Sequence, residues 1–159
     1  MIQHHPFLPL YDENAETLIL GSFPSVKTRE VNFFYGHPQN RFWKVVAAVF
    51  GSETPQSIKE KKELIFSNKL ALWDVLASCY IENSADSTIK QAKANNLSKI
   101  FENANIKNIF VNGRAAEKYY ISLIEPSLKR KAIYLPSTSP ANAAYSLERL
   151  IKEWQILKE

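Results

Sequence analysis

The chain contains little cysteine, histidine or glycine, and each shortage narrows the possible classes of protein. Its 159 residues include one cysteine, three histidines and four glycines. Because Cys79 has no partner for an intrachain disulfide, we expect a protein of a reducing compartment, the cytoplasm. His4, His5 and His37 lack the spacing of a metal-ligand set, so the sequence predicts neither a metal site nor a cofactor.

Long apolar runs and phosphate-binding glycine loops are also missing. No segment approaches the roughly 20 consecutive apolar residues that a membrane helix requires. Residues 1–5 lack the basic and then apolar pattern of a secretory signal. The sequence contains no Gly-Lys-Ser or Gly-Lys-Thr phosphate loop and no dinucleotide fingerprint. We therefore expect neither a membrane protein nor an enzyme of these nucleotide-binding classes.

Apolar residues are plentiful enough for a core of ordinary size. The hydrophobic fraction is 45% and the aromatic fraction 12%, and no repeat or linker divides the chain. We therefore predict a single domain over residues 1–159. The net charge of +4 and the pI of about 9.1 suit a polyanionic partner, although many soluble proteins carry a similar charge.

Short apolar runs alternate with helical patterns along the whole chain. The runs cover residues 17–20, 70–76, 108–111 and 132–135, and each is expected to form a buried strand. Helices are predicted over 42–50, from Ser57 with its capping partner Glu60, after Gly113, over 147–154, and in a short stretch near 95–103. Strands that alternate with helices indicate an α/β fold with a parallel sheet covered on both faces.

Ligands of such sheets bind outside the carboxyl ends of the strands. This rule selects four segments of the chain, 21–25, 73–77, 111–114 and 136–142. In the first segment, Gly21 permits close approach of a ligand and Phe23 offers an apolar wall, but an ordinary strand exit explains the same residues. In the last, hydroxyls between prolines could grip phosphates, although a solvated turn capped by Ser139, with Pro140 opening the final helix, fits as well.

Residues 32–43 combine aromatic and amide side chains, the combination that a flat heterocycle requires. The aromatics at 33–35 could instead belong to the core. Asn40 could cap the helix that follows it. If Pro38 is the first helical residue and His37 the cap, the Asn40 amide remains free for a ligand. A nucleophilic pair of Cys79 and His37 is conceivable, but Cys79 follows a buried strand and fits the core better.

Taken together, these segments resemble the uracil-DNA glycosylase superfamily and, within it, the hypoxanthine-DNA glycosylase group. The similarity spans nearly the whole chain, and the run His-Pro-x-Asn-Arg-Phe-Trp at 37–43 is a specific signal shared with mismatch-specific uracil glycosylases. The matching motifs occur in order at 21–25 (GSFPS), 34–43 (FYGHPQNRFW), 71–79 (ALWDVLASC), 84–89 (SADSTI) and 135–141 (LPSTSPA).

The resemblance implies a three-layer α/β/α fold with a central four-stranded parallel sheet. It also implies metal-free hydrolysis of the N-glycosidic bond of a deaminated base, flipped from double-stranded DNA, in base-excision repair. Hypoxanthine in deoxyinosine is the expected base. Uracil or xanthine excision by the same fold, and a non-catalytic nucleic-acid-binding domain, are the alternatives. No lysine occupies an obvious attacking position, so we expect no strand nicking, and we expect a monomer.

The resemblance also assigns roles to individual residues. Phe23 stands where mismatch-specific relatives have a water-positioning Asn, and in the hypoxanthine group that catalytic role falls to Asn40. Tyr35 takes the position that stacks on the flipped base, and Asp74 takes a base-pocket position. Asp86 and Asn112 are weaker pocket candidates. Further base contacts are expected at Ser22, Phe23 and Asn112, and DNA contacts at Ser25, His37, Ser137, Thr138, Ser139, Pro140 and Asn142.

Overall fold

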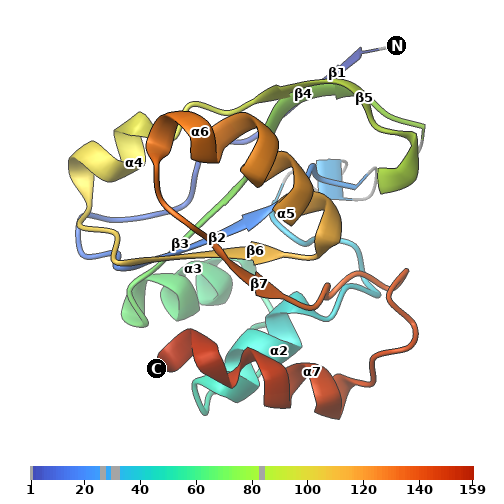
Figure 1. The fold of residues 1–159 in the computed structure, drawn as a ribbon. Helices are drawn as coiled ribbons and strands as arrows, with labels where there is room; N and C mark the ends of the chain where they lie inside the picture. The colour runs from blue at the N-terminus through green and yellow to red at the C-terminus, as the bar shows by residue number, and fades with distance from the viewer. Residues whose placement is uncertain (1, 26–27, 30–32, 83–84) are drawn as a thin grey trace.

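The computed structural model describes residues 2–25, 28–29, 33–82 and 85–159. Within these residues, a four-stranded sheet with the order β3-β2-β6-β7 forms the centre of the molecule (Figure 1). All neighbouring strands in this sheet are parallel, as the alternation of strands and helices predicted. The strands are β2 (Thr17–Gly21), β3 (Leu70–Asp74), β6 (Asn108–Asn112) and β7 (Ile133–Leu135).

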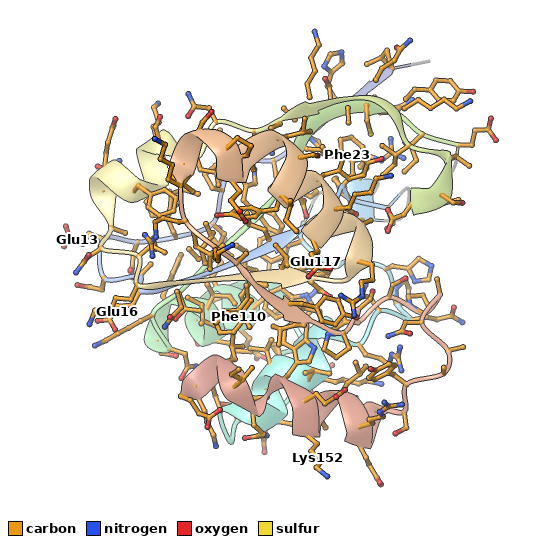
Figure 2. All side chains as sticks on the ribbon, in the orientation of Figure 1. Glu13, Glu16, Phe23, Phe110, Glu117 and Lys152 are labelled. Carbon is orange, nitrogen blue, oxygen red and sulfur yellow. The ribbon has the colours of Figure 1, made fainter. Side chains whose placement is uncertain are left out.

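Both faces of the central sheet are covered, so the predicted three-layer α/β/α arrangement is confirmed. Along β2, Leu18 and Leu20 belong to one apolar cluster and Ile19 belongs to the other, because successive side chains of a strand point to opposite faces. Phe110 of β6 packs on the Ile19 side (Figure 2). On that side lie α2 (Phe42–Val49), α3 (Ile58–Ser67) and α7 (Leu147–Glu153) (Figure 1).

The opposite face is covered by a less regular layer of helices (Figure 1). In chain order this layer contains α4 (Ser98–Asn103), α5 (Arg114–Tyr119), a π-helical segment (Tyr120–Ile124) and α6 (Glu125–Leu128). Short 3-10 segments occur at Asp86–Thr88 and, after α7, at Trp154–Lys158. In the described part of the chain, no helix has the length and apolar character needed to cross a membrane.

A second, antiparallel sheet lies above the central one, and the sequence did not predict it (Figure 1). Its order is β1 (Ile2–His4), β4 (Leu76–Tyr80) and β5 (Lys90–Ala94). The apolar run 70–76 was expected to form one strand, but the structure divides it at Val75 between the two sheets. Val75 N donates to the carbonyl of Gly21, while the carbonyl of Val75 accepts from Asn95 N. Cys79 is fully buried in β4, as the core interpretation expected.

The helix starts agree with the predictions in one place and differ in two. At α3, Ser57 Oγ accepts from Glu60 N at 3.1 Å, as predicted. The first helical residue of α2 is Phe42 rather than Pro38, and His37 is not its cap. Pro38 lies instead in a preceding turn, in which Asn40 N donates to the His37 carbonyl. The final helix begins at Leu147 with Ser146 as its cap, so Pro140 does not open it.

Candidate functional site at the carboxyl edge of the sheet

A cavity of about 250 Å³ opens at the carboxyl ends of the central strands, where the sheet topology predicted a ligand. Its wall combines the ends of β2, β3 and β6 with the loop that follows β7 and the segment before α2. The predicted site residues that line it are Ser22, Phe23, Ser25, Tyr35, His37, Asn40, Asp74, Asn112, Ser137, Thr138, Ser139 and Pro140. Asn142 is the predicted site residue that lies outside the lining. Gly21, Pro24, Thr28, Phe34, Asp86 and Ala141 complete the wall.

The floor of the cavity is built where β2 and β3 end side by side. Their register places Gly21 next to Asp74. The Asp74 side chain and the Tyr35 hydroxyl both lie close over the glycine. A Cβ atom at residue 21 would be 2.4 Å from Asp74 Oδ1 and 3.0 Å from the Tyr35 hydroxyl oxygen. Position 21 must therefore be glycine if these two groups are to keep their places.

The carboxylate of Asp74 is held from behind by His5, which sequence reasoning did not select. His5 Nε2 lies 2.7 Å from Asp74 Oδ2, and the side chains are 3% and 7% exposed. The ring of His5 is surrounded by the aromatic rings of Phe7, Phe23, Phe34 and Trp73. His5 directly follows β1, a strand with no periodic apolar signal, and no matching motif included it. The pairing of β1 with β4, together with the bridge between Leu10 and Leu72 of β3, brings it to the site.

Tyr35 contributes an aromatic ring whose two faces have different surroundings. The ring stacks on Phe42 with centroids 3.9 Å apart and planes inclined by 14°. One ring face is thus occupied, and a ligand can use only the other face or the edge. Tyr35 also has a φ of 51°, a left-handed conformation that is costly for a bulky residue. Such strain often accompanies functional positions.

The Tyr35 hydroxyl is buried and, among the described residues, has no hydrogen-bond partner. Burial raises the pKa of this phenol well above its ordinary value. The negative charge of Asp74 raises the pKa further, while the Asn112 side chain lowers it. The hydroxyl therefore stays protonated and can act as a donor toward the cavity.

Asn40 lies in the cavity wall and also makes the local bond that a capping residue makes. Its Oδ1 accepts from Phe42 N and from Thr138 Oγ1, each at 2.9 Å. Arg41 is the N-cap of α2, so Asn40 is not the cap itself, although its Oδ1 accepts from the first helical N–H; the catalytic role of Asn40 stays a prediction. Because two donors fix Oδ1, the amide orientation is defined. Nδ2 has no acceptor among the described residues, so Asn40 offers N–H donors to the cavity.

Thr138 joins Asn40 to the end of β6. Its hydroxyl accepts from Asn112 Nδ2 at 3.1 Å, and its backbone N donates to Asn112 Oδ1 at 3.1 Å. Its carbonyl accepts from Arg41 N. Thr138 is fully buried. Thr138 was expected to contact DNA and Asn112 to contact the base. In the structure the two residues bond mainly to each other, and the Thr138 hydroxyl fixes the position of Asn40.

The loop after β7 is held in shape by its own side chains and by Arg41. The Arg41 guanidinium donates to the carbonyls of Ser139 and Asn142, each at 3.0 Å, and to that of Tyr145. Asn142 Nδ2 donates to the Ser137 carbonyl, so Asn142 shapes the loop without lining the cavity. Ser137 Oγ and Ser139 Oγ accept from the backbone N–H groups of Ser139 and Ala141. The result is a stiff rim on one side of the cavity.

A second carboxylate, that of Asp86, also lines the cavity. Ser22 Oγ donates to Asp86 Oδ1 at 3.1 Å. Desolvation raises the pKa of Asp86 above its ordinary value of 3.8, and Asp74 raises it further, while the Ser22 hydroxyl lowers it. Ser25 is used locally, since its Oγ accepts from Thr28 N and donates to Thr28 Oγ1.

A family model now places this geometry in context. The model described as "Uracil DNA glycosylase superfamily" matches residues 8–158. The chain belongs to this superfamily. The resemblance inferred from the motifs and the fold class that it implied are therefore confirmed.

Relatives from two archaea cover most of the chain. A protein of Methanosarcina acetivorans named hypoxanthine DNA glycosylase is 36% identical over 151 residues, which cover 94% of each chain. A protein of the same name from Methanosarcina barkeri is 36% identical over 116 residues, or 71% of this chain and 73% of that protein. A solution NMR structure from M. acetivorans, provisionally named a uracil DNA glycosylase, superposes with a TM-score of 0.81 at 30% identity over both full chains.

Proposed function

We propose that this chain is a monofunctional DNA glycosylase that hydrolyses the N-glycosidic bond of hypoxanthine in deoxyinosine. One observation carries the proposal. The amide of Asn40, the ring of Tyr35 and the carboxylate of Asp74 converge on one cavity in a member of this superfamily. The relatives named hypoxanthine DNA glycosylase support the choice of base. The cavity is smaller than the roughly 300–1,000 Å³ of typical ligand pockets, which favours a single flipped base.

In the proposed reaction, the bond between the base and C1′ breaks and its electron pair leaves with the purine. The sugar becomes an oxocarbenium-like cation, and the oxygen of a water molecule forms a new bond to C1′. Asn40 Nδ2 can donate to one lone pair of the water oxygen. The second lone pair of that oxygen is then free to attack the sugar carbon. The water then loses a proton to solvent. An amide is not a strong base, but orientation alone can contribute several kcal/mol toward so electrophilic a carbon.

The charges around the cavity suit a reaction that forms a cationic sugar and an electron-rich purine. The Asp86 carboxylate lines the cavity, where a negative charge stabilises a cationic sugar. The protonated Tyr35 hydroxyl is a donor suited to the electron-rich purine. We assign the phosphate contacts to the rim 137–141, whose stiffness would allow it to press into a duplex.

The first experiment is a panel of duplexes that carry hypoxanthine, uracil or xanthine, followed by alkaline cleavage at abasic sites. We expect purified protein to release hypoxanthine and to leave the strand intact before alkali. Asn40→Ala should reduce the rate of release by roughly 10²- to 10³-fold, the loss typical of a removed charge-stabilising or positioning group. Wild-type rates from this variant would contradict the proposal. Preferential release of uracil or xanthine would support the alternative substrates of the same fold.

We also propose that residues 1–159 act as one domain, on double-stranded DNA, as a monomer and in the cytoplasm. Size-exclusion chromatography with and without a deoxyinosine duplex tests the stoichiometry, with one protein per lesion expected. Salt-sensitive DNA binding without release of any base would instead indicate a non-catalytic nucleic-acid-binding domain.

A further inference from the structure

Asp74 is the charged group on the cavity floor, and its two oxygens have different partners. Oδ2 faces His5 Nε2 at 2.7 Å. Oδ1 lies over Gly21 and has no hydrogen-bond partner in the described part of the chain. A carboxylate accepts hydrogen bonds but does not donate them when it is ionised. The floor therefore presents one acceptor, Oδ1, whose direction is set by the bond on the other oxygen.

The surroundings of His5 leave it little freedom. Its Nδ1 lies 3.1 Å from both the N and the carbonyl O of Phe7. Nε2 faces Asp74 and donates to its ionised carboxylate, which can only accept, so the matching role of Nδ1 is to accept from Phe7 N. Four aromatic rings hold the imidazole from the other sides. His5 does not line the cavity, so it can affect a ligand only through Asp74.

Deamination changes the hydrogen-bonding edge of a base in one consistent way. Adenine and cytosine each present a ring nitrogen lone pair beside an amino group. Their deaminated products, hypoxanthine and uracil, present a ring N–H beside a carbonyl. A fixed acceptor pairs with the ring N–H of the product and repels the lone pair of the parent base. Sites that are built to form such a bond reject a ligand lacking it by roughly 10⁴-fold, because their buried group is left unpaired.

Given the base-pocket position that the resemblance assigns to Asp74, we propose that His5 is the positioning residue that aims Asp74 Oδ1 at the ring N–H of the flipped base. The inference rests on the proposed function for the identity of the ligand. The His5 N–H also draws charge from the carboxylate, which limits its repulsion of the purine as the purine departs with an electron pair. His5 thus has two effects on the reaction, one on the choice of base and one on the rate.

The decisive variant is Asp74→Asn, which keeps the size of the side chain. His5 Nε2 then donates to the amide oxygen, and the amide nitrogen takes the place of Oδ1. The floor changes from an acceptor to a donor. We expect free hypoxanthine to bind more weakly and free adenine more tightly, so that the ratio of their Kd values shifts by at least about tenfold, or 1.4 kcal/mol. NMR titration with each free base measures this without turnover.

Variants of His5 separate positioning from structure. His5→Phe keeps a ring in the aromatic cluster but removes the donor, whereas His5→Gln keeps a donor. We expect His5→Phe to lose most of the preference for hypoxanthine over adenine and to lower kcat, and His5→Gln to restore much of both. In the double variant His5→Phe with Asp74→Asn, the amide is free to rotate, so the adenine preference of Asp74→Asn should disappear. His4→Phe is the matched control, because His4 is the exposed neighbour.

The outcomes distinguish this inference from the proposed function. If the wild-type protein releases no hypoxanthine from DNA, the proposed function fails, and the base titrations still report on Asp74. If Asp74→Asn keeps the wild-type ratio of Kd values, or if His5→Phe lowers every rate equally with the ratio unchanged, the inference is wrong. Should Asp74→Asn fail to fold, the comparison of His5→Phe with His5→Gln decides.

Discussion

At the scale of single residues, Asn40 has an amide whose two ends have different surroundings. Its oxygen is used by Phe42 N and the Thr138 hydroxyl, while its nitrogen is left for the cavity. Asn40→Asp keeps the oxygen that accepts these bonds and removes the N–H donors. We expect a loss of kcat nearly as large as in Asn40→Ala, with the melting temperature close to that of the wild type. Full or higher activity of Asn40→Asp would show that an acceptor, rather than a donor, handles the water.

A second prediction at this scale concerns Gly21 and has a control within the chain. Gly21→Ala forces the new Cβ against Asp74 Oδ1, so we expect kcat/KM for deoxyinosine to fall by at least about tenfold, or 1.4 kcal/mol. Gly51 has no atom within 4 Å of an added Cβ but has a φ of 69°. Gly51→Ala should therefore lower the free energy of unfolding by about 1 kcal/mol or more and leave activity intact. Urea unfolding and release assays on both variants test this contrast.

The raised pKa of Asp86 predicts a pH dependence of stability. Between the ordinary value of 3.8 and the raised folded pKa, the folded state binds more protons than the unfolded state. The contribution of Asp86 to the free energy of unfolding is therefore greatest at low pH and falls as pH rises through this window. Asp86→Asn removes that contribution.

The measurement is urea unfolding of wild type and Asp86→Asn over roughly pH 4 to 8. The free energy of unfolding of the wild type, minus that of the variant, should decrease with pH and then level off. A difference that rises with pH would mean that the folded state favours the charged carboxylate.

At the scale of elements, the loop after β7 depends on a residue at the start of α2. Arg41 donates to three loop carbonyls, those of Ser139, Asn142 and Tyr145. Lysine lacks the planar fork that reaches several acceptors at once. We expect Arg41→Lys to raise KM for duplex DNA more than it lowers kcat, and to speed amide hydrogen exchange in residues 137–145.

Arg114→Lys is the control for this element, because exposed Arg114 pairs with Glu117 and stacks on the ring of Tyr134 but donates to no described carbonyl of the loop 137–145. Its KM and exchange rates should match the wild type. If both substitutions change KM and amide exchange equally, Arg41 has no special role in holding the loop.

The elements also show how far sequence reasoning reaches. The central strands were predictable because buried parallel strands are continuous apolar runs. The break at Val75 was not, since Ala71 before it and Leu76 after it are buried in the same apolar cluster. β5 was missed because Lys90 and Lys93 lie on an edge strand, where charge is common but the apolar signal is absent. The prediction that Pro38 is the first residue of α2 was wrong. The Asn40 side chain accepts from Phe42 N, and the helix begins at Phe42.

The same limits apply to the candidate site. Residues at the ends of predicted strands, such as Asp74 and Asn112, could be placed by topology alone. The resemblance contributed Tyr35 and Asn40. His5 could not be predicted, because its place depends on a long-range pairing between β1 and β4. Its partner Asp74 lies 69 positions along the chain.

At the scale of the whole molecule, the net charge of +4 predicts how binding responds to salt. Contacts to phosphate release counterions, so the Kd for a deoxyinosine duplex should rise steeply as salt increases. Binding of free hypoxanthine involves no phosphate and should change little. Titrations of both ligands across a salt series test this. A similar salt dependence for the free base would place the electrostatic contribution inside the cavity rather than on the surface.

The pairing of β1 with β4 holds His5 behind Asp74, so under the role proposed for His5 the segment 2–5 contributes to the selectivity of the site. The four strands of the central sheet include none of these residues, so a protein trimmed at its amino end could keep its scaffold and still lose the imidazole behind the carboxylate. Such a protein would resemble the intact one in a folding assay but would be less able to tell a damaged base from a normal one. A long amino-terminal fusion that competes with β1 for the edge of β4 could have the same effect.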